Sequence, residues 1–219
     1  MRIPALFQFL SDLKTHNSKE WFDSNRKDYQ LLRDEFLLFI SDVLIELGKI
    51  DDRFAAMNAS KCIFRINRDI RFSKNKDPYK TNFGMNLNLS GSKEFFCGFY
   101  LHLEPENTFF AGGTYLPPSA ILQSIRQEID YNATDFKKIV ESKKFAHAFR
   151  GITGDSLSRP PKGYDADNEM INYIKLKSFV AEKRISTADL TSIQLKEMIV
   201  EYAELIMPLN NFLLTAISH

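Results

Sequence analysis

The chain has 219 residues, and its 29 lysines and arginines nearly balance its 28 aspartates and glutamates, which leaves a formal net charge of +1. Hydrophobic residues make up 44% of the chain and charged residues 26%, which is ordinary for a globular protein and excludes a disordered, collagen-like or coiled-coil chain. The near-zero net charge argues against a protein that coats nucleic acid non-specifically, although a local basic patch is compatible with it. The length predicts a single domain over residues 1–219.

The targeting signals of the sequence are few. The apolar N-terminal stretch is interrupted by Asp12 and Lys14, so it is too short for a signal peptide. No run approaches the roughly 18 apolar residues of a membrane-spanning helix, so we expect no membrane partner. Cys62 and Cys97 lie in separate apolar stretches and are predicted to be buried thiols in a reducing compartment. We therefore expect a cytoplasmic protein.

Residues 1–52 are predicted to be helical. Ser18 is a suitable N-cap for a helix whose apolar stripe runs from Trp21 to Leu47 and which stops at Gly48. A continuous helix over these thirty residues would be about 45 Å long, so we expect a bend or a break in it.

Residues 60–116 are predicted to be mainly β. The expected strands are Lys61–Arg68, Asn82–Leu89, Phe95–Glu104 and Thr108–Leu116, and their close spacing indicates antiparallel pairing. Alternation in these strands predicts one apolar face that is buried under helices, with Phe83, Met85, Leu87, Phe99, Leu101 and Leu103 on it.

The C-terminal half is predicted to return to helices. We expect helices over residues 117–150, a strand over Tyr173–Ile185, and C-terminal helices over residues 187–217 that bend or divide at Pro208. The fold class that follows is α+β, with a single antiparallel sheet of about five strands packed with long N- and C-terminal amphipathic helices.

The segment Lys61–Lys80, called the basic segment below, contains seven basic and two acidic residues, a local charge of +5. Arginine offers planar, bidentate donors to phosphate or carboxylate, so the segment is a candidate anion site. The competing interpretation is that its arginines are structural clamps on nearby carboxylates. Within the site interpretation we expect Arg65 to be a clamp and the arginines at the strand exit to be ligand donors. The candidate ligand-binding residues are Arg65, Arg68, Arg71, Lys76 and Lys80.

A second candidate site lies on the polar face of the predicted strands. His102 and Glu104 are two residues apart and share a face, so they are candidate catalytic residues, with His102 as general acid/base and Glu104 orienting it. Tyr100 shares that face, and Lys175 and Lys177 share a face of the last predicted strand, so all three are candidate ligand-binding residues. The competing interpretation is an ordinary sheet with one solvated face.

The other motifs do not predict a metal site or a phosphate-binding loop. Two adjacent metal ligands are too few for a site, and no HExxH or paired-cysteine motif is present, so no metal site is predicted and the cofactor is left unknown. Gly112-Gly113 is loosely similar to a phosphate loop, but close packing of a strand against a helix is its commoner meaning.

Several long motifs resemble one uncharacterised bacterial and fungal family, called domain of unknown function 2461. The matching runs are Phe64–Lys74, Lys76–Asn82, Gly98–Pro105, Gly112–Pro117, Ile125–Asp130, Pro161–Tyr164 and Leu176–Phe179, together with Trp21-Phe22, Asn25-Arg26 and Tyr29. The resemblance covers nearly the whole chain. It implies a single-domain protein and does not supply a reaction.

The function we expect is that of a binding protein or enzyme that holds a phosphate-bearing or carboxylate ligand through the basic segment, so the expected partner is a small anionic ligand. The alternative is a non-enzymatic adaptor that docks an acidic protein or nucleic acid through the same segment. A deep cleft with His102 beside the arginines favours the first, and a flat basic surface with strongly salt-dependent affinity favours the second. The reaction and the oligomeric state stay open.

Overall fold

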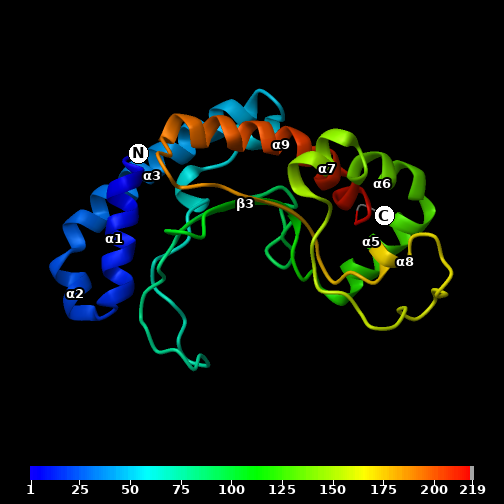
Figure 1. Ribbon diagram of the computed structural model, residues 1–219, viewed down its shortest axis with the longest axis horizontal. Helices are drawn as coiled ribbons and strands as arrows, with labels where there is room; N and C mark the ends of the chain where they lie inside the picture. The colour runs from blue at the N-terminus through cyan, green and yellow to red at the C-terminus, as the bar shows by residue number, and fades with distance from the viewer. Residues whose placement is uncertain (218–219) are drawn as a thin grey trace. The chain divides into compact units, whose positions relative to one another are not determined.

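A computed structural model of the protein describes residues 1–217. The elements in chain order (Figure 1) are α1 (Ile3–Thr15), α2 (Lys19–Ser24), α3 (Arg26–Gly48), α4 (Asp52–Ala55), the 3₁₀ helix η1 (Ala59–Lys61), β1 (Phe83–Asn88), β2 (Gly98–Leu103), β3 (Phe109–Thr114), α5 (Ser119–Tyr131), α6 (Ala133–Val140), α7 (Lys143–Phe149), α8 (Ile171–Ile174), β4 (Phe179–Arg184) and α9 (Ser192–Thr215). None of the helices in this described part of the chain has the length and apolarity needed to cross a bilayer.

The chain divides into two compact units, each built from several segments. The first unit contains residues 1–87, 100–110 and 184–201, and the second contains residues 88–99, 111–183 and 202–219. All four strands and helix α9 therefore pass from one unit into the other along the chain. The single domain expected over residues 1–219 stays a prediction.

The four strands form one antiparallel sheet in the order β1-β2-β3-β4, which confirms the α+β class with one strand fewer than expected. The predicted apolar face is correct. Each of its six side chains is at most 4% exposed, namely Phe83, Met85, Leu87, Phe99, Leu101 and Leu103. These buried residues could be predicted from the sequence because every second side chain along a strand points to the same face.

The helical start of the chain follows its predicted signals. The Ser18 hydroxyl accepts from the Trp21 backbone N–H at 3.3 Å and caps α2. The expected break falls at Asn25, whose side-chain amide donates to the Trp21 carbonyl at 2.8 Å. Helix α3 then runs to Gly48 and packs on β1, with the Phe36 and Phe83 ring centroids 5.5 Å apart.

One predicted strand is absent, and another begins later than predicted. The span Lys61–Arg68 pairs only through isolated antiparallel bridges, Ile63 with Met85 and Asn67 with Tyr79, because half of its residues are charged or polar and only Cys62 and Ile66 are buried. The span Tyr173–Ile185 begins in helix α8 and becomes a strand only at Phe179. Met170 and Ile174 are both fully buried four residues apart, which is a helical spacing.

The Gly112-Gly113 pair lies near the end of β3, in the second unit. A Cβ on Gly112 would lie 2.6 Å from Cγ2 of Ile206 in α9, and one on Gly113, whose φ is +119°, would lie 1.9 Å from the Phe179 carbonyl oxygen. The pair therefore permits close packing, and the comparison with a phosphate loop is wrong.

Helix α9 continues through Pro208, so the expected division of this helix does not occur. The fully buried Asn210 anchors it in the second unit, where its side chain donates to the Gly98 carbonyl at 3.4 Å and accepts from the Cys97 thiol at 3.7 Å. Cys62 and Cys97 are buried thiols and are not joined in a disulfide.

Candidate functional site

The basic segment includes the long teal loop in Figure 1, and Asn17 binds the end of this segment. The side chain of Asn17, between α1 and α2, donates to the Tyr79 carbonyl and accepts from the Tyr79 N–H, both at 3.1 Å. The buried Tyr79 ring stacks on Phe22 of α2 at a centroid distance of 4.1 Å. Because both backbone groups of Tyr79 are held by one side chain, this end of the segment is fixed in the first unit.

Most of the predicted donors bind groups within the segment itself. Arg68 donates to the Asp77 carbonyl at 3.2 Å and to the Ser73 hydroxyl at 3.4 Å. Arg71 donates to both carboxylate oxygens of Asp69, at 2.9 and 2.7 Å. Lys76 donates to the Ile70 carbonyl at 3.0 Å. These bonds hold the loop to itself, and only the bond of Arg71 to Asp69 is with a carboxylate, so the ligand-binding roles of these side chains stay predictions.

Lys80 and Arg65 differ from the other cations. The Lys80 ammonium donates to the Arg65 carbonyl at 2.9 Å and lies 5.1 Å from the centre of the Phe64 ring. Burial, and then the charge of Arg65, lower the pKa of Lys80. Within residues 1–217 the guanidinium of Arg65 has no hydrogen bond and no carboxylate within 4.0 Å. Arg68 therefore has local partners and the Arg65 guanidinium has none of this kind, which is the opposite of the expected pairing, while the ligand-binding roles stay predictions.

Arg65 lines a pocket of about 240 Å³ in the first unit, called the arginine pocket below. Arg26 and Arg33 of α3 line it as well, so three arginines border one small volume. Arg26 pairs with Asp23, and Nη1 of Arg33 lies 3.7 Å from Asp34. The remaining lining residues are Phe22, Tyr29, Ser60, Ile63, Phe64, Ile66 and Asn67.

Sequence reasoning did not place the α3 residues in this site. Arg26, Tyr29 and Arg33 are three and four residues apart, so they lie on one face of a helix. That spacing was a usable signal, but nothing in the sequence alone says that the basic segment faces this side of α3.

The second candidate site is a hydrogen-bonded chain on the polar face of β2. The Tyr100 hydroxyl lies 2.9 Å from Nδ1 of His102, and Nε2 of His102 lies 3.3 Å from Oε2 of Glu104. The three predicted residues therefore contact one another in sequence order, as alternation along a strand requires. Their catalytic and ligand-binding roles stay predictions.

Glu104 is held by residues that sequence reasoning missed. Its carboxylate accepts from the Thr81 hydroxyl at 2.7 Å and from the Asn107 amide at 3.1 Å. Arg184 in turn donates to the Asn107 side-chain oxygen at 2.7 Å. Burial opposes ionisation of Glu104, but the hydrogen bonds from Thr81, Asn107 and His102 outweigh it and hold the pKa of Glu104 below its ordinary value.

The environment of His102 is partly closed. Its ring stacks on Phe109 with centroids 4.9 Å apart, and its side chain is 15% exposed. Burial, and then the charge of Glu104, raise the pKa of Tyr100. The polar chain thus pairs a carboxylate that stays ionised with a phenol that stays protonated near neutral pH.

Lys175 and Lys177 lie in the second unit and do not share a strand face. Lys175 follows α8 as its C-cap, and the Lys177 N–H donates to the Asp155 carbonyl at 2.8 Å. The prediction placed them on a strand that begins only at Phe179, so their shared face was wrong.

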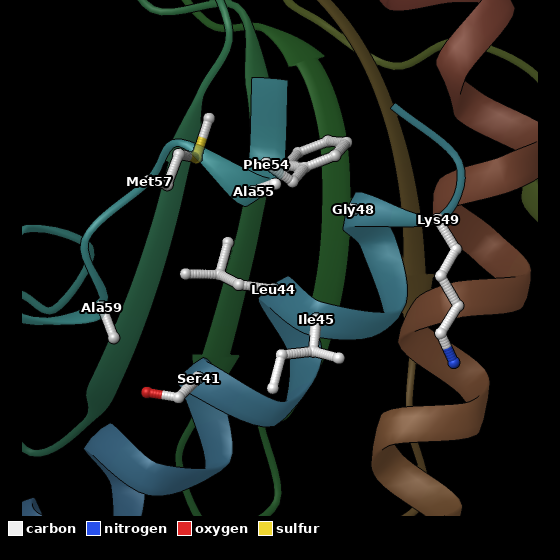
Figure 2. Close-up of a pocket in the computed structure, with 9 residues that line it drawn as sticks. All are labelled: Ser41, Leu44, Ile45, Gly48, Lys49, Phe54, Ala55, Met57 and Ala59. Atoms are coloured by element: carbon white, nitrogen blue, oxygen red, sulfur yellow. The ribbon is translucent and has the colours of Figure 1, made fainter. Parts of the chain in front are cut away.

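A larger pocket, of about 520 Å³, lies between α3 and α4 (Figure 2). Its lining is largely apolar, with Leu44, Ile45, Phe54 and Met57 among it. The Lys49 side chain extends away from the other lining residues in Figure 2 and binds Glu46 at 2.6 Å. This pocket lacks the convergent polar groups of a specific site and contains none of the predicted site residues.

The described residues, 1–217, contain no cluster of three or more histidine, cysteine, aspartate or glutamate side chains placed to hold a metal ion. Residues 5–212 match the family described as "Conserved hypothetical protein (DUF2461)". The chain belongs to this family. The match spans both compact units and includes every predicted site residue. Comparisons with curated proteins and with solved structures give no match.

Proposed function

We propose that this protein binds a small ligand with a phosphate or carboxylate group in the arginine pocket. The observation that carries the proposal is the guanidinium of Arg65, which has no hydrogen bond and no carboxylate within 4.0 Å among residues 1–217 and borders the same pocket as Arg26 and Arg33. A guanidinium has five donors in a planar fork that fits either anion, so an unpaired one at a pocket is a ready binding group.

The size and the remaining lining agree with a small anion. A volume of about 240 Å³ is below the range of roughly 300–1,000 Å³ that is typical of pockets for drug-sized ligands. Tyr29 and Ser60 add hydroxyl groups, and Asn67 adds an amide. An anion there relieves the repulsion among the three arginines, so binding and stability are coupled.

The test is thermal unfolding with phosphate, pyrophosphate and citrate at fixed ionic strength, so that screening does not imitate binding. At a hundredfold excess over its dissociation constant, a ligand stabilises the folded state by about 2.7 kcal/mol. For a chain of this size that is a rise in melting temperature of several degrees, since about 1 kcal/mol corresponds to roughly 2–4 °C.

Arg65→Met and Arg33→Met are expected to abolish this rise. Arg71→Met is the matched control, because it removes one positive charge from the same segment but lies outside the pocket. A parent that none of the three anions stabilises, or a rise that Arg65→Met leaves intact, would refute the proposal.

One observation supports the adaptor function as a second candidate. Phe72 is 95% exposed in the basic segment, and the Arg71 guanidinium lies 5.7 Å from the centre of its ring. An exposed aromatic ring beside cations is typical of surfaces that stack on single-stranded nucleic acid. In that case Phe72→Ala and Arg71→Met weaken binding to an oligonucleotide, binding falls steeply with salt, and Arg65→Met has no special effect.

A further inference from the structure

Four side chains that line the arginine pocket have donor groups that no described residue uses. Within residues 1–217 no hydrogen bond is formed by the side chains of Tyr29 and Arg33 on α3, or by those of Arg65 and Asn67 in the basic segment. The one ion pair of this set is long, with Nη1 of Arg33 3.7 Å from the Asp34 carboxylate. Two elements of the first unit therefore contribute unused donors to one volume.

Tyr29 has the most restricted position of the four. Its ring packs against the rings of Phe9, Phe22 and Phe83, at centroid distances of 6.2, 5.0 and 5.9 Å. Burial raises the pKa of Tyr29 and the charge of Arg33 only partly opposes this, so the phenol stays protonated and can donate. A tyrosine hydroxyl in such a packed position ordinarily finds a hydrogen-bond partner, and a ligand in the pocket can supply the missing acceptor.

The arrangement of these donors favours a tetrahedral acceptor over a planar one. Tyr29 and Arg33 are four residues apart and share a face of α3, whereas Arg65 and Asn67 belong to the basic segment. A carboxylate accepts close to its own plane, so donors from outside that plane bind it less well. A phosphoryl group has three strong acceptor oxygens in different directions, so it can accept from both elements at once.

The volume of the arginine pocket and its apolar lining limit the rest of the ligand. A pocket of about 240 Å³ has room for about eight non-hydrogen atoms, at the roughly 30 Å³ that a water molecule occupies, and a phosphate group takes up more than half of that room. Phe22 and Ile66 are buried and line the same pocket, so the remaining atoms meet apolar side chains. A short alkyl group fits these limits, and a nucleoside does not.

We infer that the arginine pocket is specific for a small alkyl phosphate monoester, whose phosphate accepts from Tyr29 and Arg33 of α3 and from Arg65 and Asn67 of the basic segment. The alkyl group lies against the apolar lining. This inference rests on the proposed function and narrows its ligand from any phosphate or carboxylate to one class.

The first test compares ethyl phosphate with succinate by calorimetric titration at fixed ionic strength. Both are dianions at about pH 8, because a phosphate monoester has its second pKa near 6 and carboxyl groups ionise at lower pH. The two anions are also similar in size, so charge alone predicts equal affinity. Donors from two elements predict that ethyl phosphate binds at least about tenfold more tightly, which corresponds to one charged hydrogen bond. Succinate that binds as tightly as ethyl phosphate would overturn the inference.

The second test removes single donors. Tyr29→Phe is expected to weaken binding of ethyl phosphate by about tenfold and to affect succinate much less, and Asn67→Ala should act in the same direction. Tyr131→Phe is the matched control, because this hydroxyl lies outside the pocket on a side chain that is 77% exposed. Unchanged affinity of Tyr29→Phe for ethyl phosphate would contradict recognition by both elements.

Melting curves without ligand show whether Tyr29→Phe still folds. The variant keeps the ring that packs against Phe9, Phe22 and Phe83, and the hydroxyl it loses has no partner within residues 1–217. Its melting temperature is therefore expected to stay close to that of the parent. A large drop would show that the hydroxyl has a structural role, which would also overturn the inference.

Adenosine monophosphate tests the size limit, because it presents the same phosphate group on a much larger body. It is expected to bind at least about tenfold more weakly than ethyl phosphate, since a nucleoside exceeds the volume of the pocket. Equal binding of the two esters would overturn the restriction to small alkyl groups.

The titrations also separate this inference from the proposed function. If neither ethyl phosphate nor succinate binds, and no anion raises the melting temperature, the arginine pocket is not an anion site and both proposals are wrong. If both anions bind equally well and Arg65→Met abolishes both, the proposed function stands. In that case the choice of a phosphate ester is wrong.

Discussion

The polar face of β2, which Glu104 continues just beyond the strand, and the basic segment both carry polar side chains, but different features of the chain determine which partners these side chains bind. On β2, alternate residues face one side, so Tyr100, His102 and Glu104 contact one another in order. In the basic segment the backbone is irregular, and Arg68, Arg71, Lys76 and Lys80 each bind a group within the segment, as Arg71 does with Asp69. A regular period therefore predicts which side chains meet, whereas a loop of the same polarity does not.

The largest expected effect compares two apolar side chains, one from each region. Leu101 of β2 is fully buried and Phe72 of the basic segment is 95% exposed. Leu101→Ala is expected to lower the free energy of unfolding by about 2–5 kcal/mol, because it removes buried atoms and leaves a cavity. Phe72→Ala is expected to change it by less than about 0.5 kcal/mol. Urea unfolding measures both, and a costly Phe72→Ala would show that the loop is packed.

The next effect concerns the polar face of β2. Glu104→Gln removes a charge that accepts from Thr81, Asn107 and His102, and is expected to cost about 1–3 kcal/mol near neutral pH. The pKa of Glu104 is lowered in the folded state, so the ionised carboxylate contributes stability that is present above the pKa of the unfolded chain. That contribution is lost as pH falls through the folded-state pKa.

Unfolding measured along a pH series therefore checks the Glu104 network. The difference between the parent and Glu104→Gln is expected to narrow toward acid pH, because glutamine does not titrate. A difference that stays constant down to acid pH would mean that shape, and not charge, accounts for the cost.

A smaller effect is expected where the basic segment meets the N-terminal helices. Asn17→Ala removes both bonds to the Tyr79 backbone and is expected to cost about 1–2 kcal/mol. Cleavage by trypsin at Lys74 or Lys76 should become faster, because this end of the segment loses its anchor. Asn75→Ala is the matched control, since its side chain binds only Asp77 beside it. Equal cleavage of the two variants would contradict an anchor at Asn17.

The sequence correctly predicted those features that are determined within a single helix or strand. The buried face of the strands and the sequence in which Tyr100, His102 and Glu104 contact one another follow from the period of a strand. The Ser18 cap follows from the residue types that helices prefer at the N-cap. The arginine pocket did not follow, because Arg26 and Arg65 come from distant segments that only the folded chain brings together. Thr81 and Asn107 were missed for the same reason, since neither lies within β2, the strand that Glu104 directly follows.

The smallest expected effect concerns Arg68 and Arg65, for which the sequence predicted the opposite pairing. Arg68→Met breaks bonds to the Asp77 carbonyl and the Ser73 hydroxyl and is expected to cost about 0.5–1.5 kcal/mol without any ligand. Arg65→Met strands no carboxylate, so its free energy of unfolding is expected to stay within about 0.5 kcal/mol of the parent. The variant loses the repulsion between Arg65 and Lys80 but also the attraction between Arg65 and Asp69, so the two changes oppose each other. Added salt screens both, so the difference from the parent should stay small as ionic strength rises. Melting curves of the parent and both variants at two salt concentrations, without added multivalent anion, measure these differences in stability.

A strongly destabilised Arg65→Met would make Arg65 a structural clamp. It would leave the arginine pocket without the unpaired guanidinium on which its proposed function depends.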